Sequence, residues 1–256
     1  MTSRYPFARL ELDHYPRSGR YDPTWIVENQ MGPHPLWLME ALTDVMPLQR
    51  GSRVLDLGAG TALTSIFLAK EFEVSVVAAD LWVDPTENER RIHAAEVEDL
   101  VLPVRVQAHD LPFGDESFDA IVSVDAYHYF GTGELFLSRC AEMLRPGGRI
   151  GIVVPGLAAE LETLPPHLAA VWDPACWTFH GPAWWRRHWE RSGSVDVERA
   201  DLLPEGWKEW LLWLEVCEEM GVDTDPNEIR MVREDAGRNL GFSRIVARKP
   251  GRRPEP

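Results

Sequence analysis

Two glycines separated by one residue, with an aspartate before them and another about twenty residues later, form the most informative chemical pattern in this sequence. Gly58 and Gly60 permit positive φ and let a ligand approach the backbone closely. Asp56 stands where its charge would repel a pyrophosphate but could hold an ammonium group. Asp80 lies at the reach from which a carboxylate accepts hydrogen bonds from ribose hydroxyls. Together these residues predict a site for a nucleoside that carries an amino acid.

The residues within the turn argue against a dinucleotide. The run from Gly58 to Leu63 ends in leucine where the G-x-G-x-x-G fingerprint has its third glycine. Backbone N–H groups from Gly58 to Thr61, at the start of the following helix, are expected to receive a carboxylate. An NAD-dependent oxidoreductase shares the glycine turn and the ribose acid, so it stays as an alternative.

The elements that must position these residues are alternating strands and helices. Residues 53–57 suit a buried parallel strand that runs into the turn, and the alternation continues to about residue 154. Strands near 195–200 and 242–249 would complete the sheet. We therefore expect an α/β fold with a doubly wound, mostly parallel sheet. The chain is expected to form a single domain (1–256), with an N-terminal cap (1–50) and a cofactor-binding core (51–155).

Further segments follow in an order that resembles the class I S-adenosylmethionine-dependent methyltransferases. Residues 74–80 resemble that family's second strand and its acid, and residues 107–113 resemble its adenine-binding stretch. Residues 118–125 and 144–153 resemble its fourth and fifth strands. The similarity is greatest to the small-molecule branch, methyltransferase type 11, which includes the ubiquinone and menaquinone biosynthesis enzymes. It implies a Rossmann-like, seven-stranded sheet and methyl transfer from S-adenosylmethionine to a small-molecule acceptor, with release of S-adenosylhomocysteine.

The resemblance also assigns cofactor contacts residue by residue. Asp110 would bind the adenine amine and Leu111 would cover the ring, although Asp110 could instead cap a turn before a proline. Asp56 could bind the ammonium or cap local backbone. The expected cofactor residues are Asp56, Gly58, Ala59, Gly60, Thr61, Asp80, Leu81, His109, Asp110, Leu111 and Asp125.

Tyr127 and His128 are the candidate catalytic residues, because they leave the carboxyl end of the fourth strand. A histidine with a reference pKa near 6.5 is a reasonable general base for a phenol, hydroxyl or ammonium nucleophile. Packing against neighbouring helices explains either side chain nearly as well. A protein that binds the cofactor without catalysis is therefore a second alternative.

Aromatic segments after residue 155 are expected to form helices over the cofactor site. These helical lid insertions are assigned to residues 156–190 and 205–240, and several of the 11 tryptophans lie in them. Tyr21 and His34 could close over the cofactor from the N-terminal side. The tail, residues 250–256, is expected to be disordered.

Composition excludes several classes of partner. A formal net charge of −15 disfavours nucleic acid and anionic membranes. The 3 cysteines lack metal-ligand spacing and suit a reducing cytoplasm, while no clustered carboxylates indicate a metal. No apolar leader or membrane span is seen in the sequence, so we expect a cytoplasmic protein. Asp125 and the residues after it lack the two prolines of DNA-base methyltransferases, and the sequence carries no signal for oligomeric state.

Overall fold

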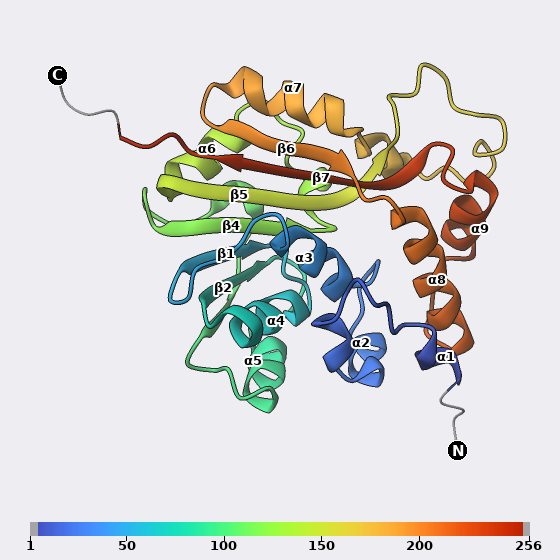
Figure 1. Ribbon diagram of the computed structural model, residues 1–256, viewed down its shortest axis with the longest axis horizontal. Helices are drawn as coiled ribbons and strands as arrows, with labels where there is room; N and C mark the ends of the chain where they lie inside the picture. Colours follow the sequence, from blue (N-terminus) through green and yellow to red (C-terminus); the bar gives the residue numbers. More distant parts are fainter. Residues whose placement is uncertain (1–4, 253–256) are drawn as a thin grey trace.

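Successive residues of the central strand are apolar on both sides, so the sheet must be covered on both faces. The computed structural model describes residues 5–252. In it Val54 packs into one hydrophobic cluster, whereas Leu55 and Leu57 pack into another on the opposite face. Helices form a layer over each face (Figure 1).

The sheet has seven strands in the order β3-β2-β1-β4-β5-β7-β6. All of them are parallel except β7, which pairs antiparallel with both β5 and β6. This confirms the seven-stranded, mostly parallel arrangement expected from the sequence. The strands are β1 (Arg53–Leu57), β2 (Ser75–Asp80), β3 (Val101–Arg105), β4 (Phe118–Val124), β5 (Leu144–Leu157), β6 (Asp196–Leu202) and β7 (Leu240–Arg248).

The longer helices divide between the two faces. One face is covered by α3 (Pro35–Thr43), α4 (Leu63–Phe72) and α5 (Pro85–Ala94), and the other by α6 (Phe136–Met143) and α7 (Pro182–Ser192). The remaining α-helices, α1 (Tyr5–Ala8), α2 (Pro23–Glu28), α8 (Gly206–Glu219) and α9 (Pro226–Asp235), gather at the end of the sheet where β4 finishes (Figure 1). Single 3-10 turns are η1 (Ser18–Arg20), η2 (Ala108–Asp110), η3 (Tyr127–Tyr129) and η4 (Pro174–Thr178).

Local sequence explains where several of these helices begin. Asp22, Asp84 and Asp225 each accept a hydrogen bond from a backbone N–H two residues on, and each precedes a proline. This arrangement satisfies an orphan N–H, while the proline occupies the position whose missing N–H does no harm. In α3 the cap is His34, whose Nδ1 accepts from the N–H of Trp37 at 3.2 Å. His34 is therefore a buried structural residue and does not close over the site.

The segment expected to form the first helical lid is organised differently. Within residues 156–190 the only α-helix is α7, which begins at Pro182, and between the end of β5 and α7 the chain is loop with the short turn η4. The loop is interrupted by prolines, which restrict helix formation. The α7 helix packs on the face of the sheet that α6 also covers, where Trp185 and Trp189 are fully buried against Tyr127. These tryptophans are core residues.

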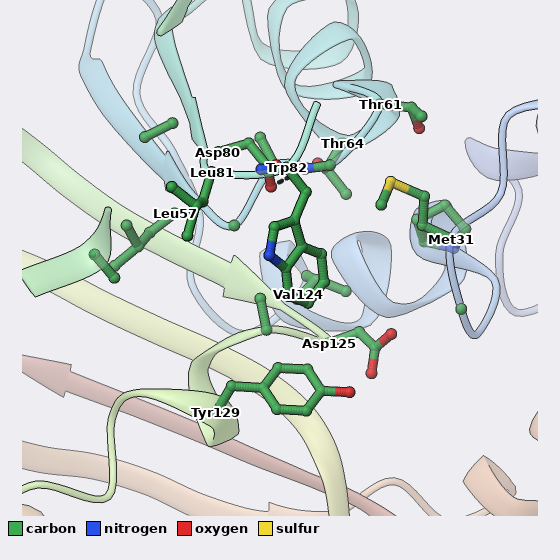
Figure 2. Close-up of a pocket in the computed structure, with 18 of the residues that line it drawn as sticks. Met31, Leu57, Thr61, Thr64, Asp80, Leu81, Trp82, Val124, Asp125 and Tyr129 are labelled. Atoms are coloured by element: carbon green, nitrogen blue, oxygen red, sulfur yellow. Dashed lines mark hydrogen bonds between the residues drawn. The ribbon is translucent and has the colours of Figure 1, made fainter. Parts of the chain in front are cut away.

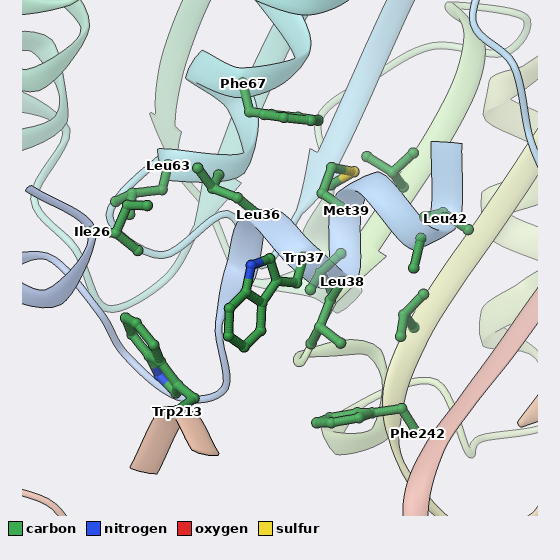
Figure 3. Packing of buried hydrophobic residues seen from close by; sticks show 14 of the residues in the cluster. Ile26, Leu36, Trp37, Leu38, Met39, Leu42, Leu63, Phe67, Trp213 and Phe242 are labelled. Carbon is green, nitrogen blue, oxygen red and sulfur yellow. The ribbon is translucent and has the colours of Figure 1, made fainter. Parts of the chain in front are cut away.

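The second expected insertion, residues 205–240, does contain the helices α8 and α9. Figure 3 shows Trp213 of α8 beside Trp37, and the Trp213 Nε1–H donates to the carbonyl oxygen of Gly32 at 2.8 Å. The α8 helix therefore supports the N-terminal segment. In the described part of the chain, no helix is long and apolar enough to cross a membrane. Of the tail, residues 250–252 have no regular structure, and residues 253–256 lie outside the described residues.

Candidate active site

The turn between β1 and α4 is fastened to the end of β2. Gly58 has a φ of 78° and Gly60 a φ of 52°, the left-handed region that favours glycine. The N–H groups of Gly58 and Ala59 donate to the carbonyl oxygen of Ala79 at 2.8 and 3.1 Å. The N–H of Gly60 donates to Oδ2 of Asp80 at 2.8 Å. These three N–H groups already have partners within the protein, unlike the open carboxylate site that the sequence suggested.

Neighbouring segments press closely on both glycines. A Cβ added to Gly58 would lie 2.3 Å from the Cβ of Ala126, and one added to Gly60 would lie 3.0 Å from the sulfur of Met31. The first separation is shorter than atoms tolerate without a shift of the backbone. The turn is therefore enclosed by the loop after β4 and by the N-terminal segment.

A cavity of about 370 Å³ opens beside this turn (Figure 2). It lies at the carboxyl ends of β1, β2 and β4, where the strand order reverses and open α/β sheets bind their ligands. Most of the expected cofactor residues line it: Gly58, Ala59, Gly60, Thr61, Asp80, Leu81, His109 and Asp125.

The sequence analysis missed another part of the wall. Asn29, Met31, Gly32, Pro33 and Pro35 line the cavity, and so does Trp82. Tyr129, whose ring and hydroxyl the sequence had offered for substrate or sulfonium, lines it as well. Trp82 is 70% exposed and Tyr129 is 53% exposed, which is unusual for large aromatic side chains. A tryptophan two residues after the ribose acid was the available signal for this rim.

Asp80 organises the end of β2 as well as facing the cavity. Besides the Gly60 N–H on Oδ2, its Oδ1 accepts from the N–H groups of Trp82 and Val83 at 2.7 and 3.0 Å. An ionised carboxylate accepts about four hydrogen bonds, so these three leave acceptor capacity for a hydroxyl in the cavity. The carboxylate thus fixes the glycine turn and the Trp82 backbone while it can still accept from a ribose.

Asp56 lies beneath the cavity instead of lining it. Its Oδ2 accepts from the hydroxyls of Thr64 and Ser65 at 2.6 and 2.7 Å, and Thr64 itself lines the cavity. Burial raises the pKa of Asp56 to about 6, against the two hydroxyl hydrogen bonds, which lower it. The nearby charge of Asp80 contributes to the increase.

Asp56→Asn tests this buried carboxylate. Because its folded-state pKa of about 6 is above the reference value of 3.8, Asp56 favours folding when protonated, and this stabilisation is lost as pH rises through about 6. The free energy of unfolding of the wild type, relative to Asp56→Asn, should fall by about 2 kcal/mol between about pH 4 and pH 7. Urea unfolding across this range measures it, and parallel pH profiles for the two proteins would contradict the assignment.

Asp110 and Leu111 lie next to the cavity without lining it. The η2 turn brings His109 into the lining, leaves Asp110 exposed and buries Leu111 in the hydrophobic cluster below. Tyr21 likewise lies elsewhere, with its hydroxyl donating to Glu71 at 3.0 Å.

The 3-10 turn η3 sends its three side chains in different directions, because such a turn has three residues per revolution. Tyr127 is 0% exposed and contacts Trp185, while His128 is 0% exposed and lies against Phe179. Only Tyr129 of the three lines the cavity. The structure therefore does not bring the expected catalytic pair to the cavity wall.

Within the described structure, neither ring nitrogen of His128 has a hydrogen-bond partner. Burial lowers the pKa of His128 to about 3, so the ring is neutral across the physiological range. The hydroxyl of Tyr127 is buried without a partner as well. Both side chains fit the packing role that was the alternative to catalysis.

His128→Leu separates these roles. The unfolded state takes up a proton below about pH 6.5 that the folded state excludes, so the wild type loses stability as pH falls. Relative to the wild type, the variant should gain about 2 kcal/mol in unfolding free energy by pH 5, measured by urea unfolding. Loss of a general base would instead lower kcat about a hundredfold to ten-thousandfold, and we expect a smaller change. Identical pH profiles together with such a loss of kcat would favour the catalytic role.

The chain is similar to known methyltransferases. A family model described as a methyltransferase domain matches residues 55–152. A demethylmenaquinone methyltransferase of Beutenbergia cavernae is 30% identical over 213 residues, which is 80% of each chain. The 27-O-demethylrifamycin SV methyltransferase of Amycolatopsis mediterranei is 31% identical over 133 residues, or 49% of each chain. The chain spans about half the length of this rifamycin methyltransferase and of the methyltransferase GfsG of Streptomyces halstedii.

Solved structures share the fold. A phosphoethanolamine N-methyltransferase of Haemonchus contortus, in complex with S-adenosyl-L-methionine, superposes with a TM-score of 0.70 at 22% identity, covering 98% of this chain and 60% of the other. The geranyl diphosphate C-methyltransferase of Streptomyces coelicolor gives a TM-score of 0.65 at 17% identity, covering 82% and 79%. Because the Beutenbergia relative is 30% identical over 80% of each chain, and because the methyltransferase family model matches, the chain belongs to the class I S-adenosylmethionine-dependent methyltransferases.

Proposed function

We propose that this protein transfers a methyl group from S-adenosylmethionine to a small-molecule acceptor and releases S-adenosylhomocysteine. The observation that carries the proposal is one cavity whose lining includes both the glycine turn with Asp80 and the residues after β4. A cofactor held at the first part would present its methyl group toward the second. The acceptor would enter from the side of Asp125 and Tyr129.

The residues around the turn fit this cofactor. The backbone of Gly58, Ala59 and Gly60 lines the cavity, and Asp80 offers acceptor capacity for a ribose. Thr64 lines the cavity, and its hydroxyl donates to Asp56. An ammonium group that donates to the Thr64 hydroxyl would therefore be linked to the Asp56 carboxylate. When bound, S-adenosylmethionine supplies a methyl group already activated by its sulfonium. The chain therefore has to position the acceptor, exclude water and manage a proton.

Partner, compartment and organisation are part of the proposal. The net charge of −15 supports a small-molecule acceptor over a nucleic acid. All 3 cysteines, Cys140, Cys176 and Cys217, are free and buried, which supports a reducing cytoplasm. We also propose a single methyltransferase domain, because β6 and β7 complete the sheet that begins with β1.

Cofactor binding and methyl transfer are tested separately. Calorimetry with S-adenosylmethionine, S-adenosylhomocysteine and NAD should show binding of the first two only, and binding of NAD alone would favour an oxidoreductase. A metabolite screen that reads S-adenosylhomocysteine release then tests catalysis. Binding without release in any acceptor class would favour a non-catalytic cofactor-binding protein.

A further inference from the structure

Asp125 differs from Asp80, the other acid among the described residues that line the cavity, in how its charge is balanced. It follows β4 with a φ of 53°, a left-handed conformation that aspartate tolerates better than most residues. A Cβ added to Gly32 would lie only 2.2 Å from Oδ2 of Asp125. The N-terminal segment therefore packs directly on the carboxylate. No hydrogen bond from a described residue reaches this side chain, whereas Asp80 accepts three.

The surroundings of Asp125 lack positive charge. Among the described residues that line the cavity there is no lysine or arginine. Burial, and then the charge of Glu228 on α9, raise the pKa of Asp125 well above its ordinary value. Glu228 is held in place by the Nε1–H of Trp210 at 2.8 Å. A ligand cation would therefore be stabilised here by two carboxylates, and an anionic acceptor would be repelled.

Two aromatic rings complete the surroundings. The ring centroids of Trp82 and Tyr129 lie 6.4 Å apart, and both side chains line the cavity with Asp125 (Figure 2). Aromatic faces attract ammonium groups through their quadrupole, and the attraction grows when water is excluded. Aromatic rings beside an unpaired carboxylate are a suitable environment for a cationic amine.

We propose that the methyl acceptor is an amine, which binds as its ammonium form against Asp125 and the rings of Trp82 and Tyr129. This inference rests on the proposed methyltransferase function and adds the substrate class. For transfer, the ammonium nitrogen passes one proton to the carboxylate of Asp125. The freed lone pair then forms the N–C bond as the C–S bond breaks, and the electron pair of that bond stays on sulfur in the neutral thioether.

Asp125→Asn is the informative variant, because asparagine has the same shape and also tolerates the left-handed conformation. Binding of S-adenosylhomocysteine is measured first, by calorimetry on the full chain. If the wild type did not bind S-adenosylhomocysteine, the proposed function itself would be contradicted. With that ligand bound, the protein is titrated with matched probes: 2-phenylethylamine, 2-phenylethanol and 3-phenylpropionate, and a corresponding alkyl series.

In the wild type, the amine of at least one series should bind about tenfold or more tightly than its alcohol, and the acid should bind most weakly. Asp125→Asn should remove this preference and leave alcohol binding unchanged. Glu228→Gln keeps an acceptor for Trp210 and should reduce the preference by less. No preference for the amine in any series, or an unaltered preference in Asp125→Asn, would overturn the proposal.

The same variant distinguishes the acceptor from the cofactor as the cation beside Asp125. S-adenosylmethionine carries a sulfonium charge that S-adenosylhomocysteine lacks. If Asp125 serves the acceptor, both dissociation constants stay unchanged in Asp125→Asn. A loss of about tenfold in affinity for S-adenosylmethionine alone would assign Asp125 to the sulfonium, and an equal loss for both ligands would assign it to the ammonium group that both carry; either result would overturn the inference.

Discussion

Gly58→Val should abolish detectable binding of S-adenosylmethionine. Valine at a φ of 78° is strained, and its Cβ would have to occupy space 2.3 Å from the Cβ of Ala126. Relief of this contact requires a shift of the turn or of Ala126, and both line the cavity. Calorimetry on the folded variant should show at least a thousandfold loss, equivalent to about 4 kcal/mol of binding free energy.

Gly51→Val is the matched control. Gly51 has the same φ of 78°, but an added Cβ would meet nothing within 4 Å, and the residue does not line the cavity. This control should lose stability through backbone strain of about 1–3 kcal/mol while binding S-adenosylmethionine normally. If Gly58→Val folded and bound as tightly as Gly51→Val, the glycine turn would not form the cofactor site.

Asp80→Ala should weaken both the protein and its cofactor binding. The substitution leaves three backbone N–H groups, those of Gly60, Trp82 and Val83, without their carboxylate acceptor. Hydrogen bonds to charged groups are worth about 1.5–3 kcal/mol each, so the free energy of unfolding should fall by several kcal/mol. The loss of order in the turn and of the ribose acceptor should reduce S-adenosylmethionine affinity about a hundredfold or more.

Asp80→Asn adds a sharper test of the geometry. An asparagine amide has one acceptor oxygen. Its NH₂ group must therefore face either the Gly60 N–H or the N–H groups of Trp82 and Val83, which repels those donors. Asp84→Ala is the control, because Asp84 also accepts a backbone N–H, from Thr86 at 2.9 Å, but it does not line the cavity. It should lose a little stability, through the lost helix cap, and keep its cofactor affinity. Equal binding by the Asp80 and Asp84 variants would remove Asp80 from the site.

The sequence was sufficient to locate residues whose role follows from backbone conformation. Gly58 and Gly60 are identifiable because few other residues adopt their φ values, and Asp80 because a strand ends at it. The strands could be found as well, because a strand buried on both faces must be apolar. These features depend on local sequence.

Side-chain direction after β4 could not be found in the same way. Tyr127, His128 and Tyr129 are consecutive, and only the 3-10 geometry of η3 decides that Tyr129 faces the cavity. The contribution of Met31 was hidden for a different reason. It lines the cavity because the Thr61 hydroxyl donates to the Asn29 carbonyl oxygen at 2.6 Å, a contact between distant parts of the sequence. Such contacts depend on tertiary packing.

The hydrogen bond between Trp213 and Gly32 joins residues 181 positions apart, and it has a consequence for how the protein matures during synthesis. Synthesis proceeds from the N-terminus, and a domain generally folds as a unit. The glycine turn and Asp80 emerge early, but the Gly32 part of the cavity wall gains the Trp213 hydrogen bond only after α8 has been made. A nascent chain that ends before α8 therefore has the nucleotide-binding strands without the Trp213 contact to the cavity wall, and we expect it to retain the cofactor less well than the full chain.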